Sequence, residues 1–111
     1  MAFAGLDVGT SGSKMLVYDL DGNVIFTSSR KYNELGSDGH RELDPETVMK
    51  YVKEVLTEVG DKCPEKIEAM AITSLGESVV CLDKDGRALA NSMLTGDCRG
   101  IPETREIIEK I

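Results

Sequence analysis

The sequence has few of the residues on which several common kinds of functional site depend. Its 111 residues include no tryptophan and a single histidine, His40, in a polar, glycine-rich stretch that predicts a solvated loop. The three cysteines, Cys63, Cys81 and Cys98, lie 18 and 17 residues apart and form no C-x-x-C pair. This pattern fits neither a disulfide framework nor the usual zinc site. Three free thiols instead predict a cytoplasmic protein.

Basic residues are outnumbered, and long apolar runs are absent. Lys and Arg total 13 against 20 Asp and Glu, which gives a formal net charge of −7. This charge argues against nucleic acid and anionic membranes as partners. No apolar run approaches the roughly 18 to 20 residues of a membrane span, and residues 1–7 lack the basic start of a secretory signal. A phosphate ligand must therefore be held by local backbone donors and a metal ion.

The length fits one domain with one core, and the first 32 residues predict an antiparallel meander of three strands. Short apolar runs place these strands at residues 3–8, 14–19 and 24–32. Asp21-Gly22 lies between the second and third runs and suits a tight hairpin turn, because glycine supplies the positive φ.

A helix with signals at both ends is predicted next. Asp44 is a candidate N-cap, and Pro45 fits the first helical position. Apolar residues then form one continuous stripe, made of Val48, Tyr51, Val52, Val55, Leu56 and Val59. Gly60 is the predicted stop. Such a helix would cover one face of the meander.

The remaining elements are predicted from shorter patterns. Residues 67–73 predict a strand that is mostly buried. Residues 78–82 and 88–94 flank the Asp83–Arg87 turn and predict a second hairpin. Residues 103–111 predict a helix with isoleucines on one side. The whole pattern predicts an α/β fold with helices packed on a sheet.

The segment with the most chemistry runs from Asp7 to Lys14 and has the sequence D-V-G-T-S-G-S-K. Its glycines let backbone N–H groups approach an anion, and its hydroxyls add donors. Asp7 is a candidate ligand for Mg²⁺ through bound water, and Lys14 is a candidate partner of a transferred phosphoryl group. Neither a Walker loop nor G-x-G-x-x-G is present, and a plain polar hairpin turn is the alternative interpretation.

This segment resembles the phosphate-1 loop of the actin-like ATPase superfamily. Within that superfamily the chain most resembles the N-terminal end of the FGGY carbohydrate kinases, which include xylulokinases, gluconokinases and glycerol kinases. Four further segments resemble the family in the same order: Leu43–Glu46, Ala69–Ser74, Val79–Arg87 and Asn91–Arg99. The resemblance spans roughly residues 3–100. It implies a ribonuclease H-like α/β subdomain whose mixed sheet begins with the antiparallel meander.

The resemblance also implies ATP and Mg²⁺ as cofactors and a sugar or polyol as substrate. The residues implied to face the nucleotide phosphates are Asp7, which would also face Mg²⁺, and Gly9, Thr10, Ser11, Gly12, Ser13 and Lys14. The residues implied to lie at the sugar are Gly76, Glu77, Asp97 and Arg99. A solvated turn carboxylate is the alternative for Glu77. An internal ion pair that orders a loop is the alternative for Asp97 and Arg99.

The sequence departs from the family pattern at two places, and these departures leave the identity of the sugar open. Glycerol kinases carry Arg-Glu where this chain has Gly76-Glu77, and xylulokinases carry Met-His there. The family usually has an aromatic residue where this chain has Thr95. The resemblance therefore favours neither of these two substrates over other sugars.

Family members are several times longer than this chain and fold into two lobes. We therefore expect residues 1–111 to be part of the N-terminal lobe of a sugar kinase, with the catalytic aspartate beyond residue 111. A fragment with one wall of the cleft should be inactive alone, because phosphoryl transfer needs positioning across a closed cleft. The alternatives are a non-kinase actin-like ATPase domain, or a non-catalytic fragment that self-associates through exposed surfaces.

Overall fold

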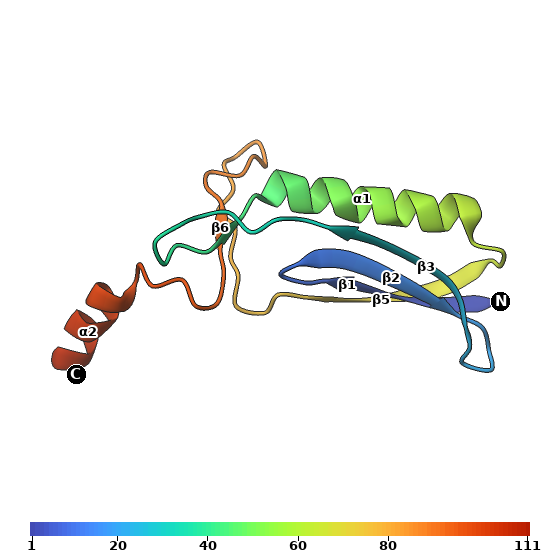
Figure 1. The fold of residues 1–111 in the computed structure, drawn as a ribbon, viewed down its shortest axis with the longest axis horizontal. Coiled ribbons are helices and arrows are strands. Elements are labelled where there is room, and N and C mark those ends of the chain that lie inside the picture. The colour runs from blue at the N-terminus through green and yellow to red at the C-terminus, as the bar shows by residue number, and fades with distance from the viewer.

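Four strands form one mixed sheet in the computed structural model, which describes residues 1–111. The predicted meander is present as β1 (Ala2–Val8), β2 (Gly12–Tyr18) and β3 (Val24–Lys31), each antiparallel to the next. A later strand, β5 (Ile67–Ser74), adds parallel to β1 at the other side. The order across the sheet is therefore β3-β2-β1-β5 (Figure 1).

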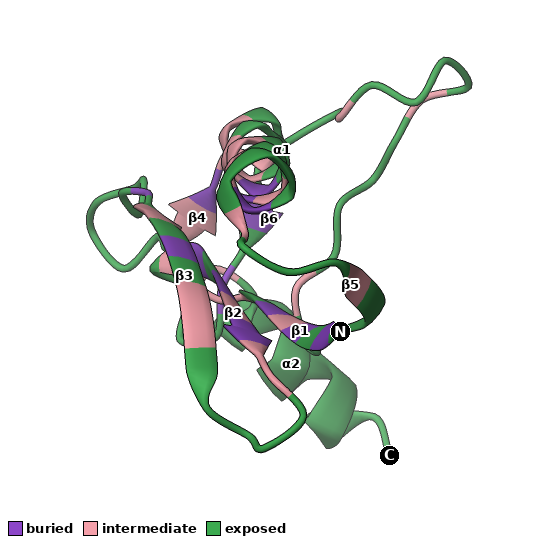
Figure 2. Ribbon diagram, turned by 90° about the vertical axis from the view of Figure 1, so that its right-hand side faces the viewer, coloured by how far each residue is buried: buried purple, intermediate pink, exposed green.

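The helix α1 (Pro45–Lys62) covers one face of this sheet (Figure 1). It begins as predicted, because the Asp44 carboxylate accepts hydrogen bonds from the backbone N–H groups of Glu46 and Thr47. The predicted apolar stripe faces the sheet. The core so formed contains Ala2, Ala4, Leu6, Met15 and Val17 from the strands and Val52, Val55 and Val59 from α1. Figure 2 shows these buried positions concentrated where α1 and the strands face each other.

The helix ends later than predicted. Gly60 lies inside α1, and the helix continues to Lys62. Cys63 then adopts an extended conformation, with φ −63° and ψ 130°. The next residue is Pro64, whose ring disfavours the helical conformation in the residue before it. The prediction of Gly60 as the stop was wrong because this proline, and not the glycine, ends the helix.

The strand β5 lies where it was predicted, but it is not buried. Only its first residue, Ile67, is half-buried, and Met70 and Ile72 are 42% and 62% exposed. β5 is an edge strand, and α1 packs against β2 and β3 at the other side of the sheet. Within this chain, α1 therefore does not cover the apolar residues of β5.

The second hairpin is reduced to its turn. The Asp83 N–H donates to the Arg87 carbonyl (2.9 Å), and a single bridge joins Leu82 to Ala88. The only regular strand in this stretch is β6 (Ser92–Met93), which pairs with β4 (Glu42–Leu43). The predicted strands at residues 78–82 and 88–94 were therefore wrong in extent, because the second one finds its partner far away in the sequence.

The last helix, α2 (Ile101–Glu109), lies apart from the sheet (Figure 1). None of its residues is buried, and Ile107 and Ile108 are largely exposed. One helix, α1, thus packs on the sheet, and the predicted apolar side of α2 has no partner in this chain. Neither helix is both long enough and apolar enough to cross a membrane. All three cysteines are free.

Candidate functional site

The predicted phosphate loop is the tight turn that connects β1 to β2. The Gly9 N–H donates to the Gly12 carbonyl (3.0 Å) and closes the turn. Thr10 and Ser11, at its tip, are exposed, and neither of their backbone N–H groups donates to an acceptor within the chain. Unused N–H groups at an exposed turn can bind an anion. The turn therefore offers two free donors.

Asp7 and Lys14 flank this turn on the same face of the sheet. They are paired directly across β1 and β2, and Thr73 of β5 pairs with Asp7 on its other side. Both side chains are exposed, on the face away from α1, because their neighbours Leu6 and Met15 face the core. No ion pair joins Asp7 to Lys14. A carboxylate for a hydrated cation and an ammonium for a phosphate are thus both available.

Two other predicted residues lie differently. The Ser13 side chain points to the α1 face, is 1% exposed, and its hydroxyl has no hydrogen-bond partner. It therefore lies on the opposite side of the sheet from Asp7 and Lys14. Gly12 packs against β3, where an added Cβ would lie 2.5 Å from the Arg30 carbonyl oxygen. Gly12 thus lets the turn lie against β3.

A residue that the sequence did not indicate, Tyr32, contacts this turn at two points. Its hydroxyl donates to the Gly9 carbonyl, and its backbone N–H donates to the Ser11 carbonyl (3.3 Å). Burial raises the pKa of the Tyr32 phenol, which lies beside the Ser13 hydroxyl. The only available signal was its position at the end of β3, next to the strand that carries the motif.

The predicted sugar residues Gly76 and Glu77 follow the end of β5 and are exposed. Because β1 and β5 are parallel and Val8 pairs with Ser74, the segment after β5 leaves the sheet at the same end of the strands as the phosphate loop. Ligands in α/β sheets commonly bind at the carboxyl ends of parallel strands. A small apolar hollow lies at this end, and its lining includes Val8, Ser74, Leu75 and Ser78.

Asp97 and Arg99 form an ion pair. The Arg99 guanidinium donates to both Asp97 carboxylate oxygens (2.8–3.1 Å), and the Arg41 backbone N–H donates to the same carboxylate (2.8 Å). These hydrogen bonds, the Arg99 ones first, hold the pKa of Asp97 far below its usual range. Arg99 also pairs with Glu42 of β4 (2.6 Å). The pair therefore ties the segment after β6 to the strand before α1.

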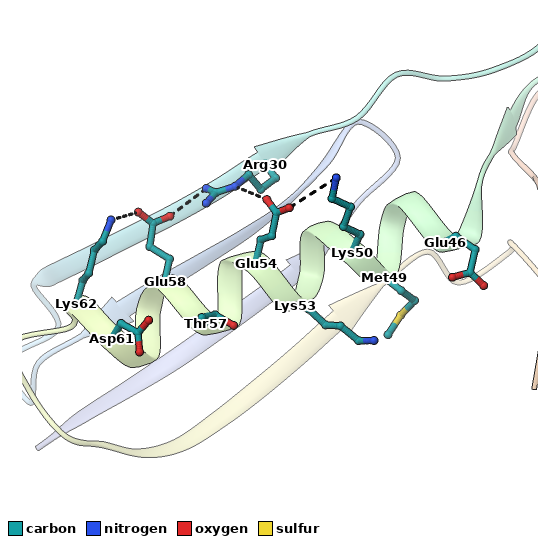
Figure 3. Close-up of a pocket in the computed structure, with 10 residues that line it drawn as sticks. All are labelled: Arg30, Glu46, Met49, Lys50, Lys53, Glu54, Thr57, Glu58, Asp61 and Lys62. Carbon is teal, nitrogen blue, oxygen red and sulfur yellow. Dashed lines mark hydrogen bonds and ion pairs between the residues drawn. The ribbon is translucent and has the colours of Figure 1, made fainter.

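The largest hollow lies elsewhere, on the outer side of α1 (Figure 3). Its charged groups are largely paired with one another. Arg30 of β3 binds Glu54 and Glu58 (both 3.0 Å), Lys62 binds Glu58 (2.9 Å), and Lys50 lies 4.0 Å from Glu54. These bonds hold α1 on β3, and the phosphate loop does not contribute to this hollow.

The possible metal ligands are few. No group of three or more His, Cys, Asp or Glu side chains lies close enough to hold a metal ion. Asp7 stands alone on its face of the sheet, which suits a hydrated Mg²⁺ that takes its other ligands from water and phosphate. The chain's residues thus fit Mg²⁺ bound together with a nucleotide, and do not fit a cation held by protein ligands alone.

Comparison with known proteins identifies the family. Residues 2–111 match the FGGY family of carbohydrate kinases, N-terminal domain, and the chain belongs to this family. A glycerol kinase from Aquifex aeolicus is 32% identical over 95% of this chain. A xylulose kinase from Bacillus subtilis is 27% identical over 96% of it. The chain spans 23% and 22% of the lengths of these two relatives.

Solved structures confirm the predicted fold class. A xylulose kinase from Rhodospirillum rubrum matches all of this chain with a TM-score of 0.91 and 25% identity, over 24% of its own length. A Plasmodium falciparum glycerol kinase with ADP matches 99% of this chain with a TM-score of 0.87 and 22% identity, over 23% of its own length. The chain therefore has the ribonuclease H-like α/β fold of the actin-like ATPases, with a mixed sheet that begins as an antiparallel meander.

Proposed function

We infer that residues 1–111 form part of the N-terminal lobe of a cytoplasmic kinase that transfers a phosphoryl group from ATP to a hydroxyl of a sugar or polyol. One observation carries this proposal. The β1–β2 turn has two unused N–H donors between the exposed Asp7 and Lys14, and it lies at the same end of the strands as the segment after β5. The family match and the sugar kinases among the relatives support it.

At the nucleotide, the N–H groups of Thr10 and Ser11 and the Lys14 ammonium would bind phosphate oxygens. Gly9 and Gly12 would shape the turn, and Ser13 would contribute through its backbone. Asp7 would hold Mg²⁺ through water, and this ion would neutralise charge on the transferred group. The exposure of Asp7 and Lys14, with no ion pair between them, supports these roles.

At the sugar, the Glu77 carboxylate would accept hydrogen bonds from hydroxyl groups, and Gly76 would leave room for the substrate. Asp97 and Arg99 would form a wall of the same pocket. Their mutual ion pair favours a role in ordering this wall, since most of their hydrogen-bonding groups are already engaged. The Ser78 hydroxyl donates to the Met93 carbonyl of β6 (2.9 Å), which supports placing the two segments in one pocket.

A kinase assay on the complete gene product tests this proposal. Glycerol, xylulose and gluconate are supplied in turn, and ATP consumption is followed. We expect consumption that depends on one of these compounds, and we expect Asp7→Asn to lower it by about ten- to hundredfold, the range for losing a group around a bound metal. Asp21→Asn, in the exposed β2–β3 turn, is the matched control and should have no effect.

Other outcomes of this assay separate the alternatives. ATP hydrolysis that no sugar stimulates would contradict the proposal and favour a non-kinase ATPase. The isolated 111-residue chain should not turn over, because the catalytic aspartate is proposed to lie beyond residue 111. Sugar-dependent turnover by this chain alone, lost in Asp7→Ala, would contradict that part of the proposal.

Self-association is the second candidate role, and one observation favours it. Apolar side chains of β5 and α2 are exposed, including Met70, Ile72, Ile107 and Ile108. Exposed apolar surface of this kind often marks a contact site. Sedimentation of the 111-residue chain tests this role, since a monomer at high concentration would exclude it.

A further inference from the structure

The Tyr32 side chain is held firmly beneath the phosphate loop. It is 7% exposed and packs in a small cluster with Leu43 and Leu94. Its ring stacks on that of Tyr51 in α1, with ring centres 6.2 Å apart and planes inclined by 11°. Stacked aromatic pairs of this geometry are stabilising. The Tyr32 hydroxyl is therefore presented from a fixed ring and not from a mobile side chain.

The hydroxyl acts on a peptide unit of the turn. It donates to the Gly9 carbonyl, and this carbonyl shares a peptide unit with the Thr10 N–H. The chain has no cis peptide bond, so the carbonyl and the N–H of this unit point in opposite directions. A carbonyl that is bound toward Tyr32 turns the Thr10 N–H away from the core.

A second bond limits the motion of the same turn. The Tyr32 N–H donates to the Ser11 carbonyl (3.3 Å), on the other side of Thr10. The bond from the Tyr32 hydroxyl to the Gly9 carbonyl is the one that a side-chain substitution can remove, because the bond from the Tyr32 N–H belongs to the backbone. Nothing in the sequence motif supplies this contact, since Tyr32 lies 23 residues from Gly9.

We propose that Tyr32 is a positioning residue of the phosphate loop, whose hydroxyl orients the Gly9–Thr10 peptide unit so that the Thr10 N–H faces the bound phosphate. This inference rests on the nucleotide role proposed above for the β1–β2 turn. Tyr32 itself touches no phosphate and acts through the peptide unit that it holds. Removal of its hydroxyl should loosen the turn and weaken phosphate binding while the core stays folded.

The test compares Tyr32→Phe with Tyr51→Phe in the 111-residue chain. Both variants keep the stacked rings, and the Tyr51 hydroxyl contacts neither Gly9 nor Ser11. The backbone order parameter of Thr10 is measured by NMR. We expect it to fall from the rigid value of about 0.85 toward about 0.6 in Tyr32→Phe only. Unchanged spectra for the rest of the sheet show that the fold is kept.

Phosphate binding is measured in the same samples with Mg²⁺·tripolyphosphate, a probe that needs no adenosine pocket. Tyr32→Phe should weaken its binding by about three- to tenfold, the range for one neutral hydrogen bond, and Tyr51→Phe should not change it. Equal binding by the wild type and Tyr32→Phe, with an unchanged Thr10 order parameter, overturns the positioning role. A wild-type chain that does not bind the probe overturns the nucleotide role, and the positioning role with it.

Discussion

Substitution of Gly12 by alanine tests whether the phosphate loop lies as close to β3 as the structure indicates. A Cβ at this position would meet the Arg30 carbonyl oxygen at 2.5 Å and the Lys31 Cα at 3.3 Å. Both contacts are with backbone, which cannot rotate away as a side chain can. The start of β2 would have to move away from β3, at the site of the turn.

The expected cost follows from this overpacking. Forcing extra atoms into a packed region destabilises a protein by about 1–3 kcal/mol. Gly5→Ala, in the neighbouring strand β1, is the matched control, because a Cβ there meets nothing within 4 Å. We expect this control to be neutral or to stabilise by about 0.4–1 kcal/mol, since alanine restricts the unfolded chain.

Urea unfolding followed by circular dichroism measures both variants. We expect a lower unfolding midpoint for Gly12→Ala and an equal or higher midpoint for Gly5→Ala than for the wild type. A Gly12→Ala variant at least as stable as Gly5→Ala would contradict the close contact of Gly12 with β3. In that case the turn would not lie against β3, and the contact of Tyr32 with the turn would need revision too.

Three further predictions concern caps and ion pairs. Asp44→Ala should lower the free energy of unfolding by about 1 kcal/mol, because the α1 N-cap is lost; urea unfolding measures this. Hydrogen bonds from Lys62, Ser28 and Arg30 lower the pKa of Glu58 from 4.5 to about 2. Its stabilising contribution is thus complete above about pH 4.5 and lost as the pH falls through about 2, so Glu58→Gln should flatten the dependence of Tm on pH in that range. Asp97→Asn should speed hydrogen exchange of the Leu94 N–H, which donates to the Arg41 carbonyl, because the Asp97 carboxylate holds Arg41 through its backbone N–H. Unchanged exchange would contradict the role of Asp97 in ordering this segment.

Much of the sheet and of α1 could be predicted because the signals are local. Short apolar runs predicted β1 to β3, and Asp44 with Pro45 marked the start of α1. The position of Ser13 could have been predicted as well. Because side chains alternate along a strand, an outward Lys14 implies an inward Ser13.

Other features depend on contacts between distant residues. The exposure of β5 depends on which strands α1 covers, and the apolar pattern of β5 holds no information on this. β6 pairs with β4, about fifty residues earlier in the chain. The Tyr32 contact with Gly9 joins two segments outside any common motif. Local patterns therefore predicted β1 to β3, α1, β5 and the turn between β1 and β2, but not the partners that hold this turn in place.

An NMR titration of the 111-residue chain with Mg²⁺·tripolyphosphate tests whether phosphate binds at the turn between β1 and β2. We expect the largest amide shift changes at Thr10 and Ser11, and we expect Asp7→Asn to reduce them. Another group of lysines, Lys50, Lys53 and Lys62 on α1, lines the separate hollow of Figure 3. Shift changes centred on these lysines, or no shift changes at millimolar probe, would contradict phosphate binding at the turn.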